Sequence, residues 1–399
     1  MKDKKNLFLL IANCLFVNNL KFNIQHSKFI LVLPIMIVND IISIFENYAP
    51  SALQESYDNS GLITGNKDLS IENILITLDC TEEVLDEAIA NNCNLIIAHH
   101  PIIFSGLKKI NGKNYVERVI IKAIKNDIAI YAVHTNLDNV SDGVNGKIAE
   151  ILQLKHTKVL LPKNGVLKKL TTFIPQTHFE IVQNALFDAG AGHIGNYSEC
   201  GFSLAGVGTF KANNDAKPFI GEINKRHQEN EVRLEVLMPF YLQNNIISAL
   251  LKVHPYEEVA HDIVAIENTF SDIGSGLIGE LENTVEPNEF LKLLKEKMEL
   301  NVIKYTPYNK KIKKIAICGG SGQFLLKNAI NEGADAFVSA DFKYHEFFDA
   351  DKSLMIADIG HYESEKFTKA LMFDLIMKKN PTFAVLLSKI NTNPVNYYY

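Results

Sequence analysis

The amino-acid sequence predicts an α/β protein, built from two α/β halves that are interrupted by a ferredoxin-like insertion. Two observations lead to this fold class. Apolar patterns typical of strands and helices alternate between about residues 36 and 165, and again between about residues 271 and 399. Between residues 166 and 270 the order changes to β-α-β-β-α-β, the split arrangement of ferredoxin-like domains. We therefore expect the segment 166–270 to be inserted into an α/β protein.

In the first half, helix and strand patterns follow one another along the chain. Asp79 is expected to cap the helix after it, because Glu82 comes three residues later. We expect, in order, a helix over 38–47, a strand over 74–78, a helix over 81–91, a strand ending at His99, a helix over 115–125, a strand ending at His134 and a helix over 144–152.

The second half repeats this alternation. There we expect strands over 315–318, 336–339 and 354–357, with helices over 324–331 and 363–377. For the insertion we expect strands over 169–175, 203–210, 233–238 and 260–266, with helices over 178–188 and 240–253. A site between the outer halves would then take residues from both.

Composition and charge exclude several classes of function. With 399 residues, of which 47% are hydrophobic, the chain can bury a large core. The net charge of −6, with no stripe of basic residues, argues against a nucleic-acid-binding surface. Five cysteines without a C-x-x-C spacing indicate neither a disulfide framework nor a thiolate zinc site. They suit a reducing compartment.

Residues that bind metals occur in three separated clusters. His99 and His100 follow the apolar run 95–98, Asp138 follows the apolar run 128–133, and His361 and Glu365 are four residues apart, on one face of a helix. Two adjacent histidines on a strand point in opposite directions unless the backbone turns, and Pro101 makes a turn there. In open α/β sheets, sites collect at the carboxyl ends of strands. Together the clusters predict a site for two divalent metal ions.

Each cluster also has a simpler explanation. His99 and His100 suit a hydrogen-bonded strand end, Asp138 suits a turn, and His361 with Glu365 suits a solvated helical face. Two glycine-rich stretches, 189–192 and 318–322, could cradle a phosphate or form plain tight turns. The segment 254–258 (HPYEE) suits either a lid or sensor over the metal site, or the end of a helix with surface carboxylates.

Five motifs resemble, in order, those of the Nif-three-like dinuclear metal-centre family. They are YDNSG at 57–61, AHHP at 98–101, HTNLD at 134–138, DFKYH at 341–345 and GHYESE at 360–365. Members of this family commonly carry the name GTP cyclohydrolase 1 type 2 homologue, and some contain an insertion that resembles the signalling protein PII. The segment 254–258 resembles the matching motif of those members. Tyr57 departs from the tryptophan that is usual in the family, and we interpret it as a packing change that leaves the metal ligands untouched.

The resemblance implies roles for individual residues. The metal ligands would be His99, His100, Asp138, His361 and Glu365, with Glu365 as the bridge between two ions. His134 and His345 would act on protons or orient ligands, with a structural hydrogen bond as the alternative. Mixed nitrogen and oxygen ligands are compatible with Zn, Mn, Fe, Ni or Co.

The function implied is a metal-dependent hydrolase that forms a homohexamer. Two divalent ions bring four positive charges against two negative ones from Asp138 and Glu365, so the centre should attract an anionic substrate, such as a nucleotide. The alternative is a non-catalytic metal-binding scaffold or regulatory protein, whose metal shell would be closed to water.

The first 35 residues fit the family least well, since the resemblance begins at Met36. Charged residues at 2–5 precede apolar runs at 7–17 and 29–38, as in a signal peptide, but neither run has the ~18 apolar residues of a membrane span. We expect residues 1–35 to be a leader outside the fold and the protein to be cytoplasmic. An export signal is the alternative.

Overall fold

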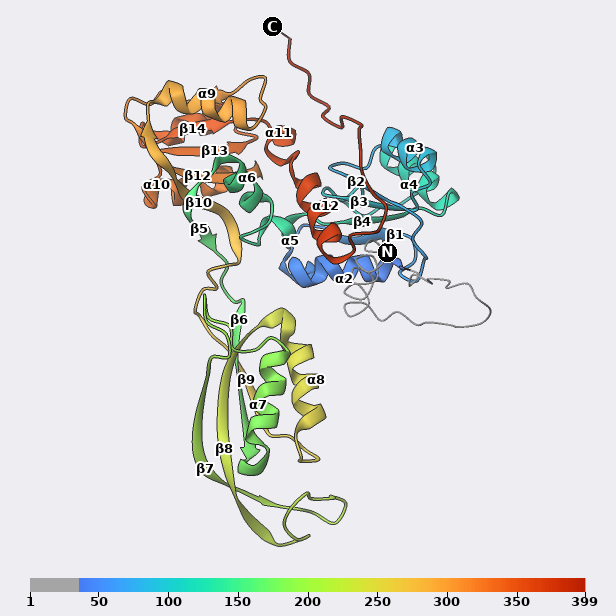
Figure 1. Ribbon diagram of the computed structural model, residues 1–399, viewed down its shortest axis with the longest axis vertical. Coiled ribbons are helices and arrows are strands. Elements are labelled where there is room, and N and C mark those ends of the chain that lie inside the picture. Colours follow the sequence, from blue (N-terminus) through green and yellow to red (C-terminus); the bar gives the residue numbers. More distant parts are fainter. Residues whose placement is uncertain (1–35, 399) are drawn as a thin grey trace, which may run out of the picture.

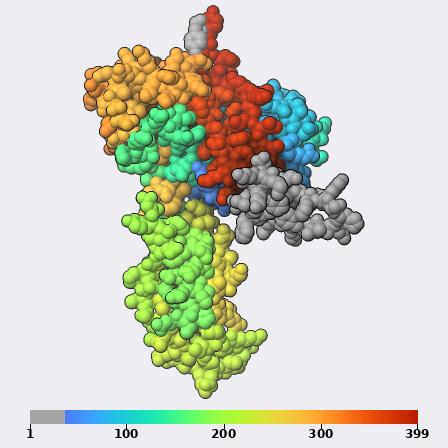
Figure 2. Space-filling model, viewed as in Figure 1, coloured from blue at the N-terminus to red at the C-terminus, as the bar shows by residue number. Residues whose placement is uncertain are grey.

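Three β-sheets organise the part of the chain described by the computed structural model, which is residues 36–398 (Figure 1). The predicted leader, residues 1–35, lies outside the described residues. Two of the sheets belong to bodies that lie side by side, and the third belongs to an elongated unit that projects from them (Figures 1 and 2). None of the described helices is long and apolar enough to span a bilayer.

The first body contains a five-stranded sheet of order β1-β4-β3-β2-β15, in which β2, β3, β4 and β15 are parallel. Its strands are β1 (Gly61–Thr64), β2 (Ile74–Thr77), β3 (Leu95–Ala98), β4 (Ala129–Ala132) and β15 (Val385–Leu387), and its helices are α2 (Val38–Tyr48), α3 (Glu82–Ala90), α4 (Tyr115–Lys125) and α12 (Thr368–Lys379). Every residue of β2, β3 and β4 is buried, as in parallel strands covered on both faces. Ile74 and Ile76 face the core beside α2 and α12, while Leu75 faces the core beside α3 and α4.

The second body contains a six-stranded sheet of order β11-β14-β13-β12-β10-β5. Its strands are β5 (Lys155–Pro162), β10 (Gly274–Val285), β11 (Lys304–Tyr305), β12 (Ile312–Ser321), β13 (Ala336–Ala340) and β14 (Met355–Asp358), and its helices are α6 (Val144–Leu152), α9 (Pro287–Lys297) and α10 (Leu326–Asn331). The short helices α5 (Thr135–Asp138) and α11 (His361–Glu365) lie where the two bodies meet.

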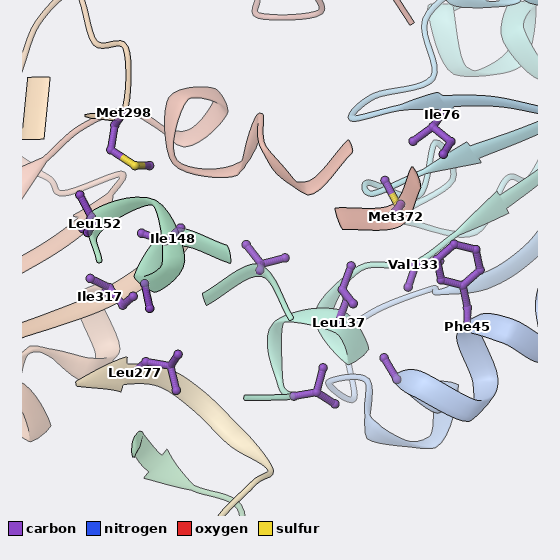
Figure 3. Packing of buried hydrophobic residues seen from close by; sticks show 14 of the residues in the cluster. Phe45, Ile76, Val133, Leu137, Ile148, Leu152, Leu277, Met298, Ile317 and Met372 are labelled. Carbon is purple, nitrogen blue, oxygen red and sulfur yellow. The ribbon is translucent and has the colours of Figure 1, made fainter. Parts of the chain in front are cut away.

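The two bodies share chain segments and a core. β5, from the first half of the chain, pairs with β10 in the second sheet, whereas β15, near the end of the chain, pairs with β2 in the first. One cluster of buried side chains runs from Phe45 and Ile76 in the first body to Ile317 and Met298 in the second (Figure 3). The bodies are therefore packed as one structure.

The insertion has the predicted β-α-β-β-α-β order. Its elements are β6 (Leu167–Pro175), α7 (Phe179–Asp188), β7 (Gly201–Lys211), β8 (Arg226–Pro239), α8 (Gln243–Val253) and β9 (His261–Ala265). The strands are antiparallel in the order β7-β8-β6-β9, and their apolar face packs on α7 and α8 in a core of its own. Its two ends are adjacent, because Lys168 pairs with Ala265.

Two local predictions were wrong. Thr81, and not Asp79, caps α3 by accepting a hydrogen bond from the amide of Val84 (3.4 Å), since Asp79 lies too far before the first turn. The helix expected over 363–377 is two helices, α11 and α12. The first begins at His361, where Gly360 has a φ of 90° that residues with a Cβ rarely adopt.

Candidate metal centre

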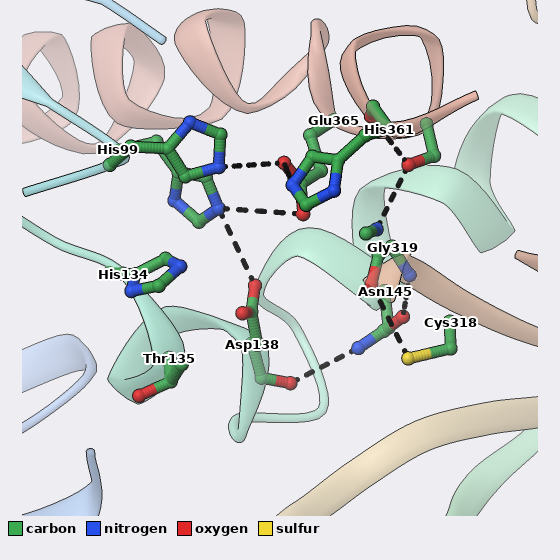
Figure 4. A network of polar contacts seen from close by, with 12 residues as sticks. His99, His134, Thr135, Asp138, Asn145, Cys318, Gly319, His361 and Glu365 are labelled. Atoms are coloured by element: carbon green, nitrogen blue, oxygen red, sulfur yellow. Dashed lines mark hydrogen bonds and ion pairs between the residues drawn. The ribbon is translucent and has the colours of Figure 1, made fainter. Parts of the chain in front are cut away.

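The predicted metal ligands meet at a cavity of about 1250 Å³ between the two bodies. His99 and His100 follow β3, Asp138 closes α5 just after β4, and His361 and Glu365 begin and end α11 just after β14. All three strands present their carboxyl ends to the cavity, which is where sites form in parallel sheets. Figure 4 shows the side chains of His99, Asp138, His361 and Glu365 facing one another.

The backbone turns after β3, so that both histidines point to the same side. The amides of His99 and His100 both donate to the carbonyl of Leu78, at 3.1 and 3.0 Å, which ends the regular alternation of the strand. The two imidazole rings then lie 4.9 Å apart between centroids. The turn expected at this position is confirmed.

Each histidine near the cavity is held through its Nδ1 atom. His100 pairs with Asp79 (2.7 Å), His361 with Asp341 (2.7 Å), and His134 with Asp58 (2.8 Å).

The fourth histidine is held by the backbone instead. His99 Nδ1 lies 2.8 Å from the carbonyl oxygen of Val133. A hydrogen bond at Nδ1 fixes the ring orientation and leaves Nε2 for a metal ion, as is usual for metal-binding histidines.

Two of the three buried side-chain polar atoms that have no hydrogen-bond partner among the described residues belong to predicted metal ligands. They are His99 Nε2 and Asp138 Oδ1, which lie 3.7 Å apart. Burying such groups without a partner costs about 1–3 kcal/mol each. A cation between them would satisfy both atoms, because zinc binds nitrogen and carboxylate oxygen at about 2.0–2.2 Å. The residues present therefore fit a metal ion.

Glu365 lies between two groups of ligands. Its Oε2 atom is 3.0 Å from His100 Nε2 and 3.1 Å from His361 Nε2, while its Oε1 atom is 3.9 Å from His99 Nε2. His100, His361 and Glu365 form a group whose ligand atoms all lie within 4.8 Å of one another. His134 joins His99 and His100 in a second such group. This His/Glu cluster could hold a metal ion.

Two adjacent glycines make room for neighbouring side chains, Gly320 for Glu365 and Gly319 for Val144. A Cβ atom on Gly320, whose φ is +60°, would lie 2.4 Å from Glu365 Oε1, and a Cβ on Gly319 would lie 2.8 Å from Val144. The stretch 318–322 was considered above as a phosphate cradle or a turn. In the structure, β12 continues through it to Ser321, and the pairing of β12 with β13 is irregular there. Gly320 therefore allows the strand to pass close to α11, and Gly319 allows it to pass close to α6.

Asn145 ties the two bodies together beside the cluster. Its side-chain amide donates to the carbonyl of Asp138 (3.1 Å), and its carbonyl accepts from the amide of Gly319 (3.0 Å) (Figure 4). Asn145 is 2% exposed, so both contacts are shielded from water. The position of Asp138 is thereby linked to the strand that supports Glu365.

The protonation of the cluster is strongly perturbed when no ion is bound. Burial lowers the pKa of His99 to about 3. Burial alone would also lower the pKa of His100 and His361, but hydrogen bonds to Asp79, Asp341 and Glu365 outweigh it and raise these pKa values to about 10 and about 11.

The pKa values of the two carboxyl groups in the cluster are shifted in opposite directions. Burial and the neighbouring charge of Glu365 raise the pKa of Asp138 well above its usual range. Burial would raise the pKa of Glu365 as well, but hydrogen bonds from His100 and His361 lower it well below its usual range. Protons on these imidazoles thus occupy the position that a metal ion would take.

Two other predicted functional features lie away from the cavity. His345 is exposed on the 3-10 helix Tyr344–Ala350, with its ring against Tyr344 and Phe348, and it does not line the cavity. His254 ends α8 and its Nε2 atom lies 3.0 Å from the carbonyl oxygen of Phe173, within the insertion. The described lining passes from Asn164 to Gly274, so within this chain the insertion forms no wall of the cavity.

Sequence reasoning missed the carboxylates that orient the histidines. Asp58 and Asp341 belong to motifs that carry the family resemblance, but no role was predicted for them, and Asp79 was interpreted as a helix cap. Their positions in the sequence could have indicated this role. Asp79 and Asp341 each come shortly after a buried strand, and that strand ends at the same sheet edge as a strand that precedes a predicted ligand.

The chain is similar in sequence and in fold to known proteins. The chain matches the family described as Duf34/NIF3 (NGG1p interacting factor 3) over residues 36–394. It is 41% identical over 363 residues to a Bacillus subtilis protein named GTP cyclohydrolase 1 type 2 homolog, covering 90% of this chain and 97% of the relative. A protein of the same name from Halalkalibacterium halodurans is 38% identical over 364 residues, covering 90% and 98%. The crystal structure of a Bacillus cereus protein related to NIF3 has a TM-score of 0.81 at 38% identity, over 92% of this chain and 100% of that one.

Proposed function

Because the chain belongs to the Duf34/NIF3 family, we propose that it is a metal-dependent hydrolase with two divalent ions at the cluster around Glu365. The observation that carries this proposal is the placement of Glu365, whose two oxygens face different ligand groups. One ion would be held by His99, Asp138 and Glu365 Oε1, and the other by His100, His361 and Glu365 Oε2. A carboxylate in this position would serve both ions at once.

The cavity beside the cluster favours catalysis over a closed scaffold. The side chains of Asp138 and His361 are 26% and 41% exposed, so a ligand position on each ion would stay open to water or substrate. Bound divalent ions would supply an acidified water and polarise an oxygen of the substrate. The chain itself would supply the orientation of the reacting groups.

His134 would move a proton in this reaction. Its Nδ1 atom is held by Asp58, which also accepts hydrogen bonds from the amide and hydroxyl of Thr135. Burial would raise the pKa of Asp58, but these hydrogen bonds outweigh it and lower that pKa, so the carboxylate stays charged. A charged Asp58 fixes His134 with Nε2 toward the cavity, where it would accept or donate the proton. His345 has no role in this proposal.

The charge of the cavity restricts where a substrate anion would bind. Seven carboxylates line it (Glu55, Asp79, Asp138, Asp341, Asp358, Glu363 and Glu365), against two lysines (Lys163 and Lys304), a balance of 2 − 7 = −5. Both lysines are paired, Lys163 with Glu55 (2.8 Å) and Lys304 with Asp358 (2.7 Å). Two divalent ions would bring the balance to −1. A negative group of the substrate would therefore bind on the ions themselves, and a phosphomonoester suits the site better than a triphosphate.

The relatives' names and the insertion complete the proposal. The name GTP cyclohydrolase 1 type 2 homolog makes a nucleotide the first substrate to test. We also propose that the insertion is a PII-like domain and that the protein assembles as a homohexamer, which is a closed symmetric assembly of an ordinary kind. The donor set is compatible with Zn, Mn, Fe, Ni or Co.

Metal analysis of two variants tests the two-ion arrangement. Glu365→Ala should lose both ions together, whereas Asp138→Ala should lose one and retain the other, because Glu365 serves both ligand groups and Asp138 serves one. Elemental analysis after dialysis gives the metal content, and a screen of phosphomonoesters and nucleotides gives the activity. Full metal content in Glu365→Ala would overturn the proposal.

A further inference from the structure

Two large aromatic side chains are exposed on the wall of the cavity beside the metal cluster. Tyr57 is 64% exposed and Phe104 is 52% exposed, and both line the cavity. Their ring centroids lie 6.3 Å apart with a 47° angle between the ring planes. The ring of Phe104 is also 6.3 Å from that of His134. Apolar rings left exposed next to a polar site are typical of ligand pockets.

The loops that carry these two rings are fixed to each other and to the metal cluster. The side-chain amide of Asn59 donates to the carbonyl of Ile103 (2.6 Å), which joins the loop of Tyr57 to the loop of Phe104. Asp58, next to Tyr57, holds His134. The pair is therefore held in place before any ligand binds, which lowers the entropy cost of binding.

This arrangement corrects the interpretation of Tyr57 as a packing residue. A side chain that contributes to a core is buried, and Tyr57 is among the exposed apolar side chains of the described chain. Its ring contributes to the surface of the cavity, so its identity bears on what the cavity binds.

We propose that Tyr57 and Phe104 stack against a planar ring of the substrate. The substrate class is then a compound with an aromatic heterocycle at one end and a phosphomonoester at the other, as in a nucleoside monophosphate. The phosphate end rests on the proposed function, since it would bind on the metal ions. The ring end rests on the exposed aromatic pair alone.

Binding of three probes to the metal-loaded protein distinguishes the contribution of the substrate's ring from that of its phosphate. Calorimetry should give guanosine monophosphate about tenfold tighter binding than ribose 5-phosphate or inorganic phosphate, because stacking on an aromatic side chain has this magnitude. Tyr57→Ala and Phe104→Ala should remove the preference for the nucleotide and leave phosphate binding unchanged. Equal affinity of wild type and both variants for guanosine monophosphate would overturn the inference and leave the proposed function intact.

A matched control is available elsewhere on the chain. Tyr344 and Phe348 form another exposed aromatic pair, with ring centroids 5.5 Å apart, and they do not line the cavity. Tyr344→Ala should therefore bind all three probes as the wild type does. Loss of the nucleotide preference in this variant would overturn the assignment to Tyr57 and Phe104.

A second measurement tests the ring without the metal ions. The chain contains no tryptophan, so Tyr57→Trp introduces a single indole at the proposed stacking position. Guanosine, which has no phosphate, should quench its fluorescence in both metal-loaded and metal-free protein, and should not quench that of Tyr344→Trp. Absence of quenching at position 57 would overturn the inference, while quenching without metal-dependent phosphate binding would leave the inference standing and contradict the proposed function.

Discussion

At the scale of single residues, the proposed centre would depend on carboxylates that contact the histidines and need not contact an ion. Asp79 and Asp341 each lie 2.7 Å from the Nδ1 atom of a histidine whose Nε2 atom faces Glu365. Replacing either carboxylate by an amide would keep the shape of the side chain but weaken the orientation of the ring. In the proposed centre, the carboxylates would therefore affect the affinity for metal by orienting the histidines.

We predict that Asp79→Asn and Asp341→Asn each weaken metal binding by about tenfold to a hundredfold. Titration against a competing chelator measures the affinity. Asp68→Asn, in an exposed turn away from the cavity, is the control and should bind metal as the wild type does. Unchanged affinity in both site variants would show that these carboxylates do not orient the ligands.

The stability of the metal-free protein should depend on pH through His100. Its pKa is about 10 in the folded chain, against about 6.5 in an unfolded chain, because hydrogen bonds to Asp79 and Glu365 outweigh burial. A pKa raised by folding stabilises the fold fully below about pH 6.5, and this contribution is lost as the pH rises through about 10. Thermal midpoints with chelator should therefore fall between pH 6.5 and 10 more steeply for the wild type than for His100→Gln. Parallel curves would contradict the assignment.

The sequence predicted the five proposed ligands but not the residues that orient them. Histidine and carboxylate pairs such as His361 and Glu365 are recognisable because helical spacing places them on one face. Asp58 and His134 are 76 positions apart and meet only through the tertiary fold. No local pattern marks such a pair.

At the scale of elements, the close passage of β12 against α11 makes Gly320 a critical position. We predict that Gly320→Ala lowers both stability and metal content, since its Cβ would collide with Glu365 Oε1 at 2.4 Å. Gly333→Ala is the matched control, because Gly333 also has a positive φ, +71°, but nothing lies within 4 Å of its Cβ.

Both variants should lose about 1 kcal/mol from backbone strain, and only Gly320→Ala should lose metal. Chemical unfolding and elemental analysis measure the two effects separately. Equal metal content in the two variants would mean that Glu365 accommodates the added methyl group.

Helices and central strands were predictable from local patterns, whereas the edges of the sheets were not. The helices over 115–125 and 144–152 match α4 and α6. β15 has three residues and takes its place only by pairing with β2, more than 300 positions earlier. β10 contains three glycines among its first six residues, which hides its apolar alternation.

At the scale of the whole molecule, the insertion is attached by two adjacent strands and has its own core. The amide of Ile266 donates to the carbonyl of Leu167 (3.3 Å), so a short linker can replace the segment between them. We predict that deleting residues 168–265 leaves the two bodies folded and metal-bound. Light scattering with metal analysis measures assembly and metal content, and an unfolded or metal-free product would show that the insertion is integral to the main fold.

The exchange of β5 and β15 between the sheets has a consequence for biosynthesis. As the ribosome extends the chain, the strands β1 to β4 are complete by Ala132, yet the outer side of β2 has no neighbour until Val385 is made. His100 likewise precedes Glu365 by 265 positions. At a rate of about 5–20 residues per second, the nascent first body would wait some tens of seconds with an unpaired strand edge. Chaperones that shield exposed strand edges would bind the nascent chain during this interval. The metal ions would bind only after translation of the chain is complete.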